Sequence, residues 1–409
     1  MPDLIRLMPD TKPNRLAVKL TSKGERAVVK GHPWIFSKSI SKINENAKTG
    51  DLVIIFSKNK NKVIAIGLYD SASPIRIKVI HNAERKVEIN SEFFHQKIEI
   101  AFEKRSELLK TNTNSYRLLF GENDGFPGLI ADMYNTVLVV KIYSEIWFPY
   151  LKSILESLQQ ISKADTIVIR LSRNLQNSKG HNFKDGEVVY GKLENEVVTF
   201  IEHGVKFSAN VIKGHKTGYF LDHRHNRKRV GELSCGKTVL DVFSYAGGFS
   251  VHALANGATE VTSLDISKQA LDLARENAKL NTYSGIYKTI SGDAFVEMKR
   301  LIKQGKRFDV VVIDPPSFAK QQSEVDLAKK KYAQLAQLGV QLTAKKGLLV
   351  LASCSSRVLA QSFFDLNTRV LNAQSRLFET LLKTNHDSDH PVSFLEGAYL
   401  KCGYYQFLE

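Results

Sequence analysis

The stretch that most constrains the fold is residues 237–281, which reads as strand, glycine turn, helix, strand and helix. Thr238–Val242 is a short apolar run, the turn contains Gly247 and Gly248, and Glu260–Leu264 is a second short run of strand type. A strand, a crossing helix and a further strand form one βαβ unit. We therefore expect an α/β domain with a parallel sheet, in which ligands bind at the carboxyl ends of the strands.

Two acids end these strands and indicate the ligand. Asp265 closes the second strand, where a carboxylate can hold the two hydroxyls of a ribose. Asp241 lies near the end of the first strand, where it would repel a pyrophosphate, and the turn lacks the G-x-G-x-x-G fingerprint of dinucleotide sites. S-adenosylmethionine, with a ribose, an ammonium and a sulfonium, suits both acids. The alternative is a generic doubly wound domain in which Asp265 is an ordinary helix cap.

The composition predicts a reduced, cytoplasmic protein of two or three domains. The chain has 409 residues, 43% of them hydrophobic, but no run approaches the ~18 apolar residues of a membrane span. The N-terminus, MPDLIRLMPD, lacks the apolar region of a secretory signal. The cysteines Cys235, Cys354 and Cys402 have neither metal nor redox spacing. We expect no membrane segment and no bound metal, and we interpret Cys235 and Cys402 as small core residues.

The positive charge is concentrated near the N-terminus. The formal net charge is +16, and residues 1–89 contain 17 Lys and Arg against 8 Asp and Glu, a balance of +9. Residues 90–195 contain 13 residues of each kind and are neutral. A basic module beside a neutral one indicates a polyanionic partner, most simply nucleic acid. The alternative is a lysine-rich surface that serves only solubility.

Residues 1–89 are predicted to form an all-β module. Four runs rich in β-branched residues are separated by Gly, Asn and Lys turns. The runs are Leu16–Leu20, Asp51–Phe56, Lys62–Tyr69 and Ile75–Val79. Between the first two lies GHPWIFSKSI, in which we expect Trp34, Ile35 and Phe36 to enter a small barrel core. The functional alternative for Trp34 is base stacking.

This N-terminal segment resembles the start of a PUA domain, the small pseudo-barrel of RNA-modifying enzymes, over roughly the first 80 residues. In that family the G-H-P-W-I-F stretch opens a helical turn packed on the barrel. The resemblance implies that the partner of the basic module is folded RNA.

Residues 90–195 are predicted to form a separate α+β module. We expect a helix over Ser91–Leu109 capped by Ser91, strands near Tyr116–Leu119 and Val137–Ile142, a helix over Phe148–Gln160 and a strand over Thr166–Arg170. The turn-rich GENDGFPGLIAD contains Glu122, Asp124 and Asp132, which we interpret as turn formers rather than metal ligands. The polar loop from Asn174 to Gly186 is a plausible boundary.

The third predicted domain, residues 196–409, begins with a hairpin around His203-Gly204 and a basic helix. We expect Asp222 to cap this helix and Arg224, Arg227 and Lys228 to share one face. The helix is either a solvated basic surface or a lid, with Phe220 toward the adenine and the basic side chains toward RNA phosphates.

Two later strands bring acids and a thiol to the same predicted edge. Arg307–Ile313 is a continuous apolar run that ends at Asp314-Pro315-Pro316, a rigid ledge beside the transferable methyl group. Gly347–Ala352 is followed by Ser353 and Cys354. A thiol near a methyl donor predicts covalent catalysis, in which a thiolate adds to C6 of a pyrimidine and makes C5 nucleophilic. Asp314 could stabilise the adduct by hydrogen bonding at N3 or N4.

Taken together, the motifs LDVFSYAGGFS, DPPSFAK, SCSS and NHDSDHPVSFLEGAYLK resemble the PUA-domain-containing ribosomal RNA large-subunit cytosine-5 methyltransferases over essentially the whole chain. The resemblance implies a PUA domain, a central α+β domain and a class I methyltransferase domain with a Rossmann-like fold. It also implies S-adenosylmethionine as cofactor and 5-methylcytosine in 23S ribosomal RNA as product. Asp314 and Cys354 match the catalytic pair, while Asp265 would hold the ribose and Asp293 the adenine amino group.

The complete set of predicted cofactor-binding residues is Phe220, Asp241, Phe243, Ser244, Gly247, Gly248, Asp265, Ile266, Asp293, Ala294 and Pro315. For Asp293 the alternative is an exposed turn acid. Many RNA cytosine-5 methyltransferases carry a second cysteine beside the motif at Asp314, but here that place is proline, so the base that removes the C5 proton is unassigned. The sequence leaves a homodimer open.

Two other functions compete with this interpretation. A methyltransferase acting on N7 or N2 of guanine needs no cysteine, and TGYFLDHR also resembles that branch of ribosomal RNA enzymes. Amino-group enzymes usually carry Asn before the two prolines, and this chain has Asp314 there. A non-catalytic RNA-binding protein would show erosion at Asp241, Asp265 or Asp314, and all three acids are present.

Overall fold

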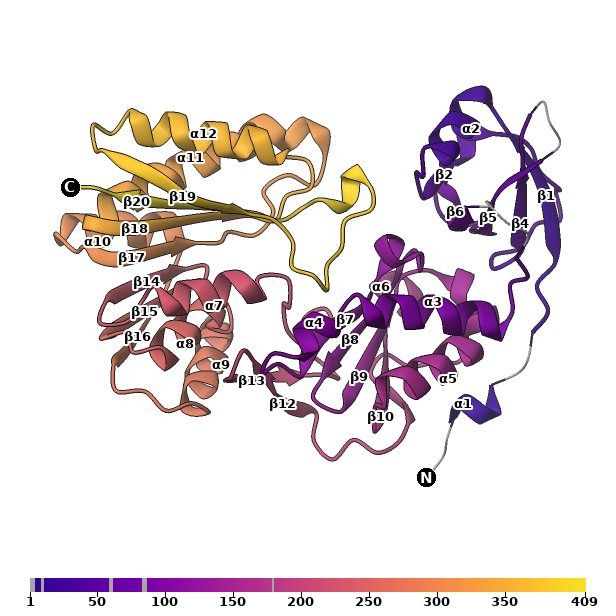
Figure 1. The fold of residues 1–409 in the computed structure, drawn as a ribbon, viewed down its shortest axis with the longest axis horizontal. Coiled ribbons are helices and arrows are strands. Elements are labelled where there is room, and N and C mark those ends of the chain that lie inside the picture. Colours follow the sequence, from indigo (N-terminus) through magenta and orange to yellow (C-terminus); the bar gives the residue numbers. More distant parts are fainter. Residues whose placement is uncertain (1–3, 9–10, 59–61, 83–86, 179) are drawn as a thin grey trace. The chain divides into compact units, whose positions relative to one another are not determined.

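The chain forms two compact units, each built from separate stretches of sequence. The computed structural model describes residues 4–8, 11–58, 62–82, 87–178 and 180–409. The first unit comprises residues 1–200, 208–221 and 388–395, and the second comprises residues 201–207, 222–387 and 396–409. Figure 1 labels the helices and strands of both units.

The N-terminal part of the first unit is a six-stranded sheet with the order β2-β6-β5-β4-β1-β3. Its strands are β1 (Arg15–Leu20), β2 (Trp34–Phe36), β3 (Ile40–Lys42), β4 (Leu52–Phe56), β5 (Val63–Tyr69) and β6 (Ile75–Asn82). The helices here are α1 (Leu4–Leu7) and α2 (Ser22–Val29), with a 3-10 turn at Ser37–Ser39. All four predicted strands are confirmed, whereas β2, β3 and α2 were not predicted. Strand β1 alternates exposed and buried positions, as a strand with one core-facing side must.

Only one of the three residues that we expected in the barrel core lies there. Ile35 is buried, but Trp34 is half-buried and Phe36 is 46% exposed. The segment is a strand, so consecutive side chains point to opposite faces and these three cannot all face inward. Trp34 instead donates its indole N–H to Glu122 Oε1 at 3.0 Å and packs edge-on against Phe394, with ring centroids 5.2 Å apart.

The central part of the first unit is a five-stranded sheet with the order β11-β10-β9-β8-β7. Its strands are β7 (Ser115–Phe120), β8 (Leu129–Tyr134), β9 (Val137–Ile142), β10 (Thr166–Leu171) and β11 (Glu187–Tyr190). Its helices are α3 (Ser91–Glu103), α4 (Ser106–Leu109), α5 (Leu151–Ser162) and α6 (Arg173–Gln176), with 3-10 helices at Gly121–Asp124 and Glu145–Tyr150. The helix predicted over residues 91–109 is interrupted at residues 104–105, and its cap is Asn90, whose Oδ1 accepts the Phe93 N–H at 3.0 Å.

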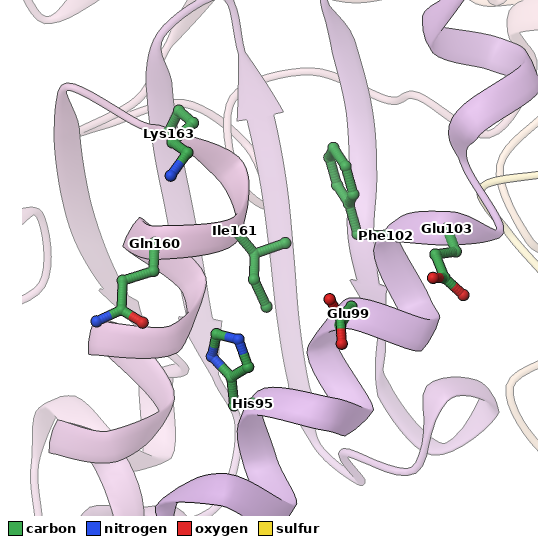
Figure 2. Close-up of a pocket in the computed structure, with 7 residues that line it drawn as sticks. All are labelled: His95, Glu99, Phe102, Glu103, Gln160, Ile161 and Lys163. Atoms are coloured by element: carbon green, nitrogen blue, oxygen red, sulfur yellow. The ribbon is translucent and has the colours of Figure 1, made fainter.

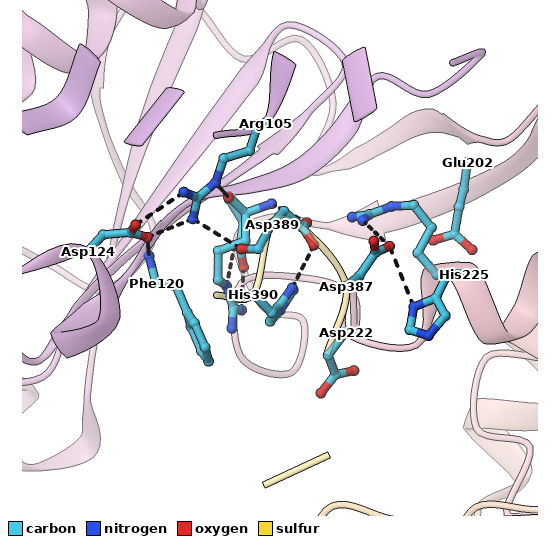
Figure 3. Close-up of polar contacts among 12 residues, drawn as sticks. Arg105, Phe120, Asp124, Glu202, Asp222, His225, Asp387, Asp389 and His390 are labelled. Carbon is cyan, nitrogen blue, oxygen red and sulfur yellow. Dashed lines mark hydrogen bonds and ion pairs between the residues drawn. The ribbon is translucent and has the colours of Figure 1, made fainter. Parts of the chain in front are cut away.

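Two of the three acids of the turn-rich segment, Asp124 and Asp132, are structural ion-pair partners. Asp124 is buried and accepts bonds from Arg105 at 2.6 and 3.1 Å, while the same guanidinium also donates to the Asp389 carbonyl at 3.1 Å (Figure 3). Asp132 lies within β8, so its interpretation as a turn former is wrong, and it pairs with Arg117 at 2.8 Å. The apolar residues of β8 favour a buried strand, and the buried charge of Asp132 is tolerated there because Arg117 neutralises it.

An open cavity of about 600 Å³ lies between α3 and α5 (Figure 2). Its lining residues are His95, Glu99, Phe102, Glu103, Gln160, Ile161 and Lys163. The cavity contains none of the predicted site residues.

The chain passes between the units at the hairpin of β12 (Val197–Glu202) and β13 (Val205–Asn210), which confirms the predicted hairpin. His203 and Gly204 have φ values of 48° and 83°, the left-handed backbone that a tight two-residue turn requires.

The second unit contains a seven-stranded sheet with the order β16-β15-β14-β17-β18-β20-β19. Its strands are β14 (Thr238–Val242), β15 (Glu260–Asp265), β16 (Ile286–Ser291), β17 (Phe308–Ile313), β18 (Thr343–Ser353), β19 (Phe378–Thr384) and β20 (Lys401–Phe407). The first five strands run parallel, and β20 is antiparallel to both of its neighbours. This arrangement confirms the predicted Rossmann-like α/β domain.

The helices of the second unit form two groups that pack among themselves and cover the two faces of the sheet (Figure 1). The first group is α7 (Arg224–Glu232), α8 (Gly248–Ala255) and α9 (Lys268–Lys279). The second is α10 (Ala294–Lys303), α11 (Val325–Leu342) and α12 (Ala360–Asn372). No helix within the described residues is long and apolar enough to cross a membrane.

Candidate active site

The loop after β14 has the backbone geometry of a close-fitting binding turn. Phe243, Tyr245 and Gly247 all have positive φ values, of 64°, 47° and 77°. A Cβ on Gly247 would lie 2.8 Å from the Ala274 Cβ, so this position needs glycine for space as well as for backbone conformation. Gly248 then begins α8.

Asp265 holds this loop in place. Its Oδ2 accepts the Tyr245 N–H at 2.9 Å and its Oδ1 accepts the Ser267 N–H at 2.8 Å. The N-cap of α9 is Ser267, so Asp265 is not the ordinary helix cap of the generic alternative. Each carboxylate oxygen has a second lone pair that can accept a ribose hydroxyl.

Asp241 and Ser244 place two unsatisfied polar atoms at the end of β14. Asp241 is buried, and its Oδ2 accepts both the N–H (3.0 Å) and the hydroxyl (2.7 Å) of Ser250. Among the described residues, Asp241 Oδ1 and Ser244 Oγ have no hydrogen-bond partner. Burial raises the pKa of Asp241 to about 7, and the charges of Asp314 and Asp265 act in the same direction. Unpaired buried polar atoms at the carboxyl edge of a parallel sheet fit a polar, cationic ligand such as S-adenosylmethionine.

Asp314 and Cys354 follow neighbouring strands at this edge of the sheet. Strands β17 and β18 pair in parallel, with Ile313 opposite Leu351, so the residues that follow them are neighbours. The Cys354 Sγ lies 3.8 Å from the carbonyl oxygen of Pro315, the residue after Asp314. Burial, and then the charges of Asp314 and Asp222, raise the pKa of the Cys354 thiol to about 12.

His223 is a site residue that the sequence did not reveal. Its Nε2 lies 3.4 Å from Asp314 Oδ1, and its Nδ1 lies 3.0 Å from the Asn226 side-chain nitrogen. Burial disfavours the charged imidazole, but Asp314 outweighs it, so the net effect is a raised pKa for His223. The only signal was its place in TGYFLDHR, and nothing in the spacing connects it with an acid 91 positions later.

Lys401 is the second missed residue. It begins β20 opposite Ser353, is 1% exposed, and donates to the carbonyls of Ser355 and Tyr399. The hydroxyl of Tyr399 in turn donates to Asp222 at 2.9 Å. Asp222 is therefore an acceptor at this site and does not cap α7, whose N-cap is His223.

The remaining predicted cofactor residues lie in different surroundings. Asp293 is exposed and caps α10 by accepting the Val296 N–H at 3.1 Å, and Ala294 is buried behind it. Ile266 is 74% exposed, and Pro315 is buried beside Cys354. Phe220, 39% exposed, belongs to the first unit, so its contact with the adenine stays a prediction.

Two of the three basic residues that we expected on an exposed face of α7 are buried. Arg224 is buried against Asp387 at 3.1 Å, and Arg227 makes two bonds of 2.7 and 2.6 Å to buried Glu202. The expectation that these two arginines face solvent or phosphates is wrong, because buried carboxylates bind them instead. Of these three residues, only Lys228 is exposed, with Glu232 as its partner.

The two cysteines that we interpreted as core residues differ in exposure. Cys402 is a buried core residue as expected, but Cys235 is exposed, so its interpretation as a core residue is wrong. Within the described ranges, no group of three or more His, Cys, Asp or Glu side chains is arranged to hold a metal ion.

Comparisons with known proteins agree with this geometry. Residues 116–387 match the model of the S-adenosylmethionine-dependent methyltransferases, and residues 18–82 match a PUA-like domain. The chain is 38% identical to the ribosomal RNA large subunit methyltransferase of Deinococcus radiodurans, over 97% of this chain and 99% of that protein. It is 35% identical to ribosomal RNA large subunit methyltransferase I of Aeromonas salmonicida, over 94% of this chain and 97% of the relative.

Solved structures share the fold over almost the whole length. A Streptococcus mutans protein described as a SAM-dependent methyltransferase superposes with a TM-score of 0.80 at 21% identity, covering 95% of this chain and 99% of the other. A second methyltransferase structure, in complex with S-adenosylhomocysteine, gives a TM-score of 0.79 at 22% identity, covering 96% and 100%. With the loop after β14 and its partner Asp265, these matches show that the chain belongs to the S-adenosylmethionine-dependent methyltransferase family, in the group of the two ribosomal RNA large subunit methyltransferases named above.

Proposed function

We propose that this methyltransferase forms 5-methylcytosine in 23S ribosomal RNA through a covalent adduct between Cys354 and C6 of the target cytosine. The observation that carries the proposal is the placement of Cys354 beside the Asp314-Pro315 turn, at the ends of the neighbouring strands β17 and β18. The names of the relatives from Deinococcus radiodurans and Aeromonas salmonicida support ribosomal RNA as the substrate.

In the proposed reaction, the Cys354 thiolate forms a bond with C6 and electron density moves to C5. Asp314 accepts a hydrogen bond from the cytosine amino group and positions the ring. C5 then takes the methyl group that S-adenosylmethionine supplies. Loss of the C5 proton to a base re-forms the C5–C6 double bond as the C6–S bond breaks, and Cys354 leaves as a thiolate. Guanine methylation at N7 or N2 would leave Cys354 without a role.

Mapping 5-methylcytosine at base resolution in ribosomal RNA from a strain lacking the gene, and from the same strain complemented with it, tests the product. We expect one cytosine of 23S ribosomal RNA to lose its methyl group in the deletion strain and to regain it on complementation. An intact methylcytosine map together with a missing methylguanine would contradict the proposal.

The cofactor contacts follow from the loop after β14. We propose that Asp241 Oδ1 and Ser244 Oγ bind the amino-acid end of S-adenosylmethionine, since both atoms are buried and unpartnered among the described residues. Asp265 would accept from the ribose hydroxyls and Asp293 from the adenine amino group. The backbone of Phe243, Gly247 and Gly248 would allow the close approach of the ligand, with Ile266, Ala294 and Pro315 lining it.

Binding of S-adenosylhomocysteine should depend on the ionisation of Asp241. Burial raises the pKa of this acid to about 7, so it is increasingly protonated, and unable to pair with an ammonium, as the pH falls below that value. Calorimetry should therefore show an affinity about tenfold lower at pH 6 than at pH 8. Asp241→Asn should remove the pH dependence of the affinity. The control Asp265→Asn should weaken binding but retain the pH dependence. An affinity in Asp241→Asn that varies with pH as in the wild type would exclude this role.

The PUA-like part is proposed to supply RNA affinity. We propose that residues 1–89 form the RNA-binding domain, residues 90–195 the central domain and residues 196–409 the methyltransferase domain. Residues 1–89 carry +9 of the +16 net charge, and many of their Lys and Arg side chains are exposed. Lys228 is a further RNA contact that we propose from its exposure on α7. A ribosomal RNA substrate is consistent with the predicted cytoplasmic location.

Removing basic side chains from this domain should flatten the salt dependence of RNA binding. Lys30, Lys38 and Lys42 are exposed, and each phosphate contact that is lost lowers the slope of log K against log salt by about 0.7 to 0.9. The triple alanine variant should therefore have a slope lower by about 2 to 3 on a 23S ribosomal RNA fragment. Replacing the exposed Lys299, Lys303 and Lys306 of the second unit with alanine is the matched control. If only the control changed the slope, the RNA footprint would lie on the methyltransferase domain.

A further inference from the structure

Lys401 is a buried cation that lacks a buried anion. Its ammonium donates to two neutral carbonyls, those of Ser355 and Tyr399, the latter at 3.0 Å. No ion pair found among the described residues involves it. Every other fully or nearly buried cation described above, such as Arg105, Arg224 and Arg227, has a carboxylate partner. A buried, unpaired ammonium is unfavourable, and burial lowers the pKa of Lys401 to about 8.

Cys354 lies next to Lys401 and would need a nearby cation to ionise. Lys401 faces Ser353 across the β18–β20 pair and bonds to Ser355, so its two contacts flank Cys354 in the chain. The thiol is buried, and its pKa is raised first by burial and then by the negative charges of Asp314 and Asp222, while Lys401 acts in the opposite direction. Lys401 itself is favoured in its charged form by Cys354. Each group would therefore ionise more readily in the presence of the other.

We propose that Lys401 is a positioning residue whose ammonium stays beside Cys354 as the counter-ion of the thiolate. The S–H bond of Cys354 breaks, its proton combines with a hydroxide ion of the solvent to form water, and the thiolate that remains is balanced by the ammonium of Lys401. The ammonium keeps its own protons, and solvent hydroxide is the only co-reactant. When the C6–S bond breaks at the end of the cycle, the departing thiolate meets the same ammonium. The inference rests on the proposed function, in which the Cys354 thiolate is the nucleophile.

The other ionisable groups around this pair are anionic or paired. Asp314, after β17, is paired with His223, and Asp222, before α7, accepts from Tyr399. The hydroxyl oxygen of Tyr332, on α11, accepts from the Ser353 hydroxyl at 2.9 Å. Asp314 and Asp222 both oppose a thiolate at Cys354, and His223 lies against Asp314. A lysine whose own contacts flank the thiol is therefore the cation that can offset these two acids at Cys354.

Thiol alkylation without RNA tests the pairing directly. The rate of iodoacetamide alkylation of Cys354 is measured from pH 6 to pH 10 in a Cys235→Ser background, because Cys235 is exposed and Cys402 is fully buried. Lys401→Met should lower the alkylation rate at pH 8 at least about tenfold and move the profile to higher pH. Lys401→Gln, which keeps a donor for the two carbonyls without the charge, should behave in the same way. Lys401→Arg should restore part of the rate at pH 8, because it keeps the positive charge.

Methyl transfer provides the second readout. In Lys401→Gln, kcat at pH 8 should fall by about the same factor as alkylation, with KM for RNA unchanged and a partial recovery at higher pH. Lys383→Met, on the adjacent strand β19 and exposed, is the matched control and should leave both profiles unchanged. Wild-type alkylation profiles in both Lys401→Gln and Lys401→Met, whatever their melting temperatures, would overturn the inference while the proposed function stood. Failure of the wild-type enzyme to form an adduct with RNA would overturn the proposed function, and the alkylation comparison would still decide the pairing.

Discussion

Cys354→Ala should abolish methyl transfer while binding of S-adenosylhomocysteine stays near the wild-type value. The thiol is the proposed nucleophile, and removing the nucleophile of an enzyme can cost on the order of 10⁶-fold in kcat. The hydrogen bond of the thiol goes to the backbone carbonyl of Pro315, and replacing the side chain of Cys354 with alanine leaves that backbone in place, so cofactor binding should be retained. Single-turnover kinetics with a 23S ribosomal RNA fragment measure the first quantity and calorimetry the second.

RNA carrying 5-fluorocytosine at the target position sharpens this test. The C5 fluorine cannot leave as a proton, so the wild-type enzyme should remain covalently attached after methyl transfer, and the complex should survive denaturing electrophoresis. Cys354→Ala should give no such complex. Cys235→Ala, at an exposed thiol, and Cys402→Ala, at a buried one, should both retain it, with at most a modest loss of stability. Methylation by Cys354→Ala at a comparable rate would contradict the cytosine-C5 mechanism and favour the purine alternative.

Glu202→Gln should lower the free energy of unfolding by about 3 to 5 kcal/mol, the usual cost of leaving a buried charge without its partner. Glu202 is fully buried in the second unit, where it accepts two bonds from Arg227 and lies 3.0 Å from His252 Nε2. Burial alone would raise the pKa of Glu202, but the Arg227 guanidinium and His252 outweigh it and hold that pKa well below its ordinary value. Urea denaturation at pH 7 measures the loss.

A double-mutant cycle separates the ion pair from general disruption. The double variant Glu202→Leu with Arg227→Met should lose much less stability than either single variant, because no charge is left unpaired. Lys228 follows Arg227 on α7 and forms an exposed ion pair with Glu232. Lys228→Gln breaks that pair and should change the free energy of unfolding by less than about 1 kcal/mol. Equal losses in the single and double variants would show that packing, not charge pairing, sets the cost.

The Glu202–Arg227 ion pair should also affect how the stability of the protein depends on pH. A carboxylate with a depressed folded-state pKa contributes stability above its unfolded value of about 4.5, and that contribution is lost as the pH falls below it. Wild-type stability should therefore fall more steeply below pH 4.5 than that of the Glu202→Leu, Arg227→Met double variant.

Apolar patterning is what made the core of each sheet predictable. β9, β14, β17 and β18 each contain a four-residue stretch in which at least three residues are Val, Ile or Leu, and such a stretch buried on both faces is typical of a strand in a parallel sheet. Strand β8 was missed because it directly follows the turn-rich GENDGFPG segment, so that Asp132 within it was interpreted as a turn former, whereas its Arg117 partner lies on the neighbouring strand β7. No local pattern shows such a partner.

Partners from distant parts of the chain also explain the errors at α7. Arg224 and Arg227 recur at a spacing that places them on one face of an exposed helix, and that face is in fact buried. Their partners, Asp387 and Glu202, are far away in the sequence. A local charge pattern cannot distinguish a solvated face from a buried one when the neutralising acids lie on other elements.

By itself, the sequence determined the βαβ unit, the edge of the sheet at which we propose that the chemistry takes place, and the residues Asp241, Asp265, Asp314 and Cys354 that lie there. These follow from short-range rules, because strand direction and right-handed crossovers bring the carboxyl ends of parallel strands together. Only the tertiary structure decided which groups surround the thiol. His223 lies 3.4 Å from Asp314 although they are distant in the sequence, and Lys401 reaches the carbonyl of Ser355 from the antiparallel strand β20. The ionisation of a buried group depends on charges a few ångströms away, and folding, not spacing along the chain, sets those distances.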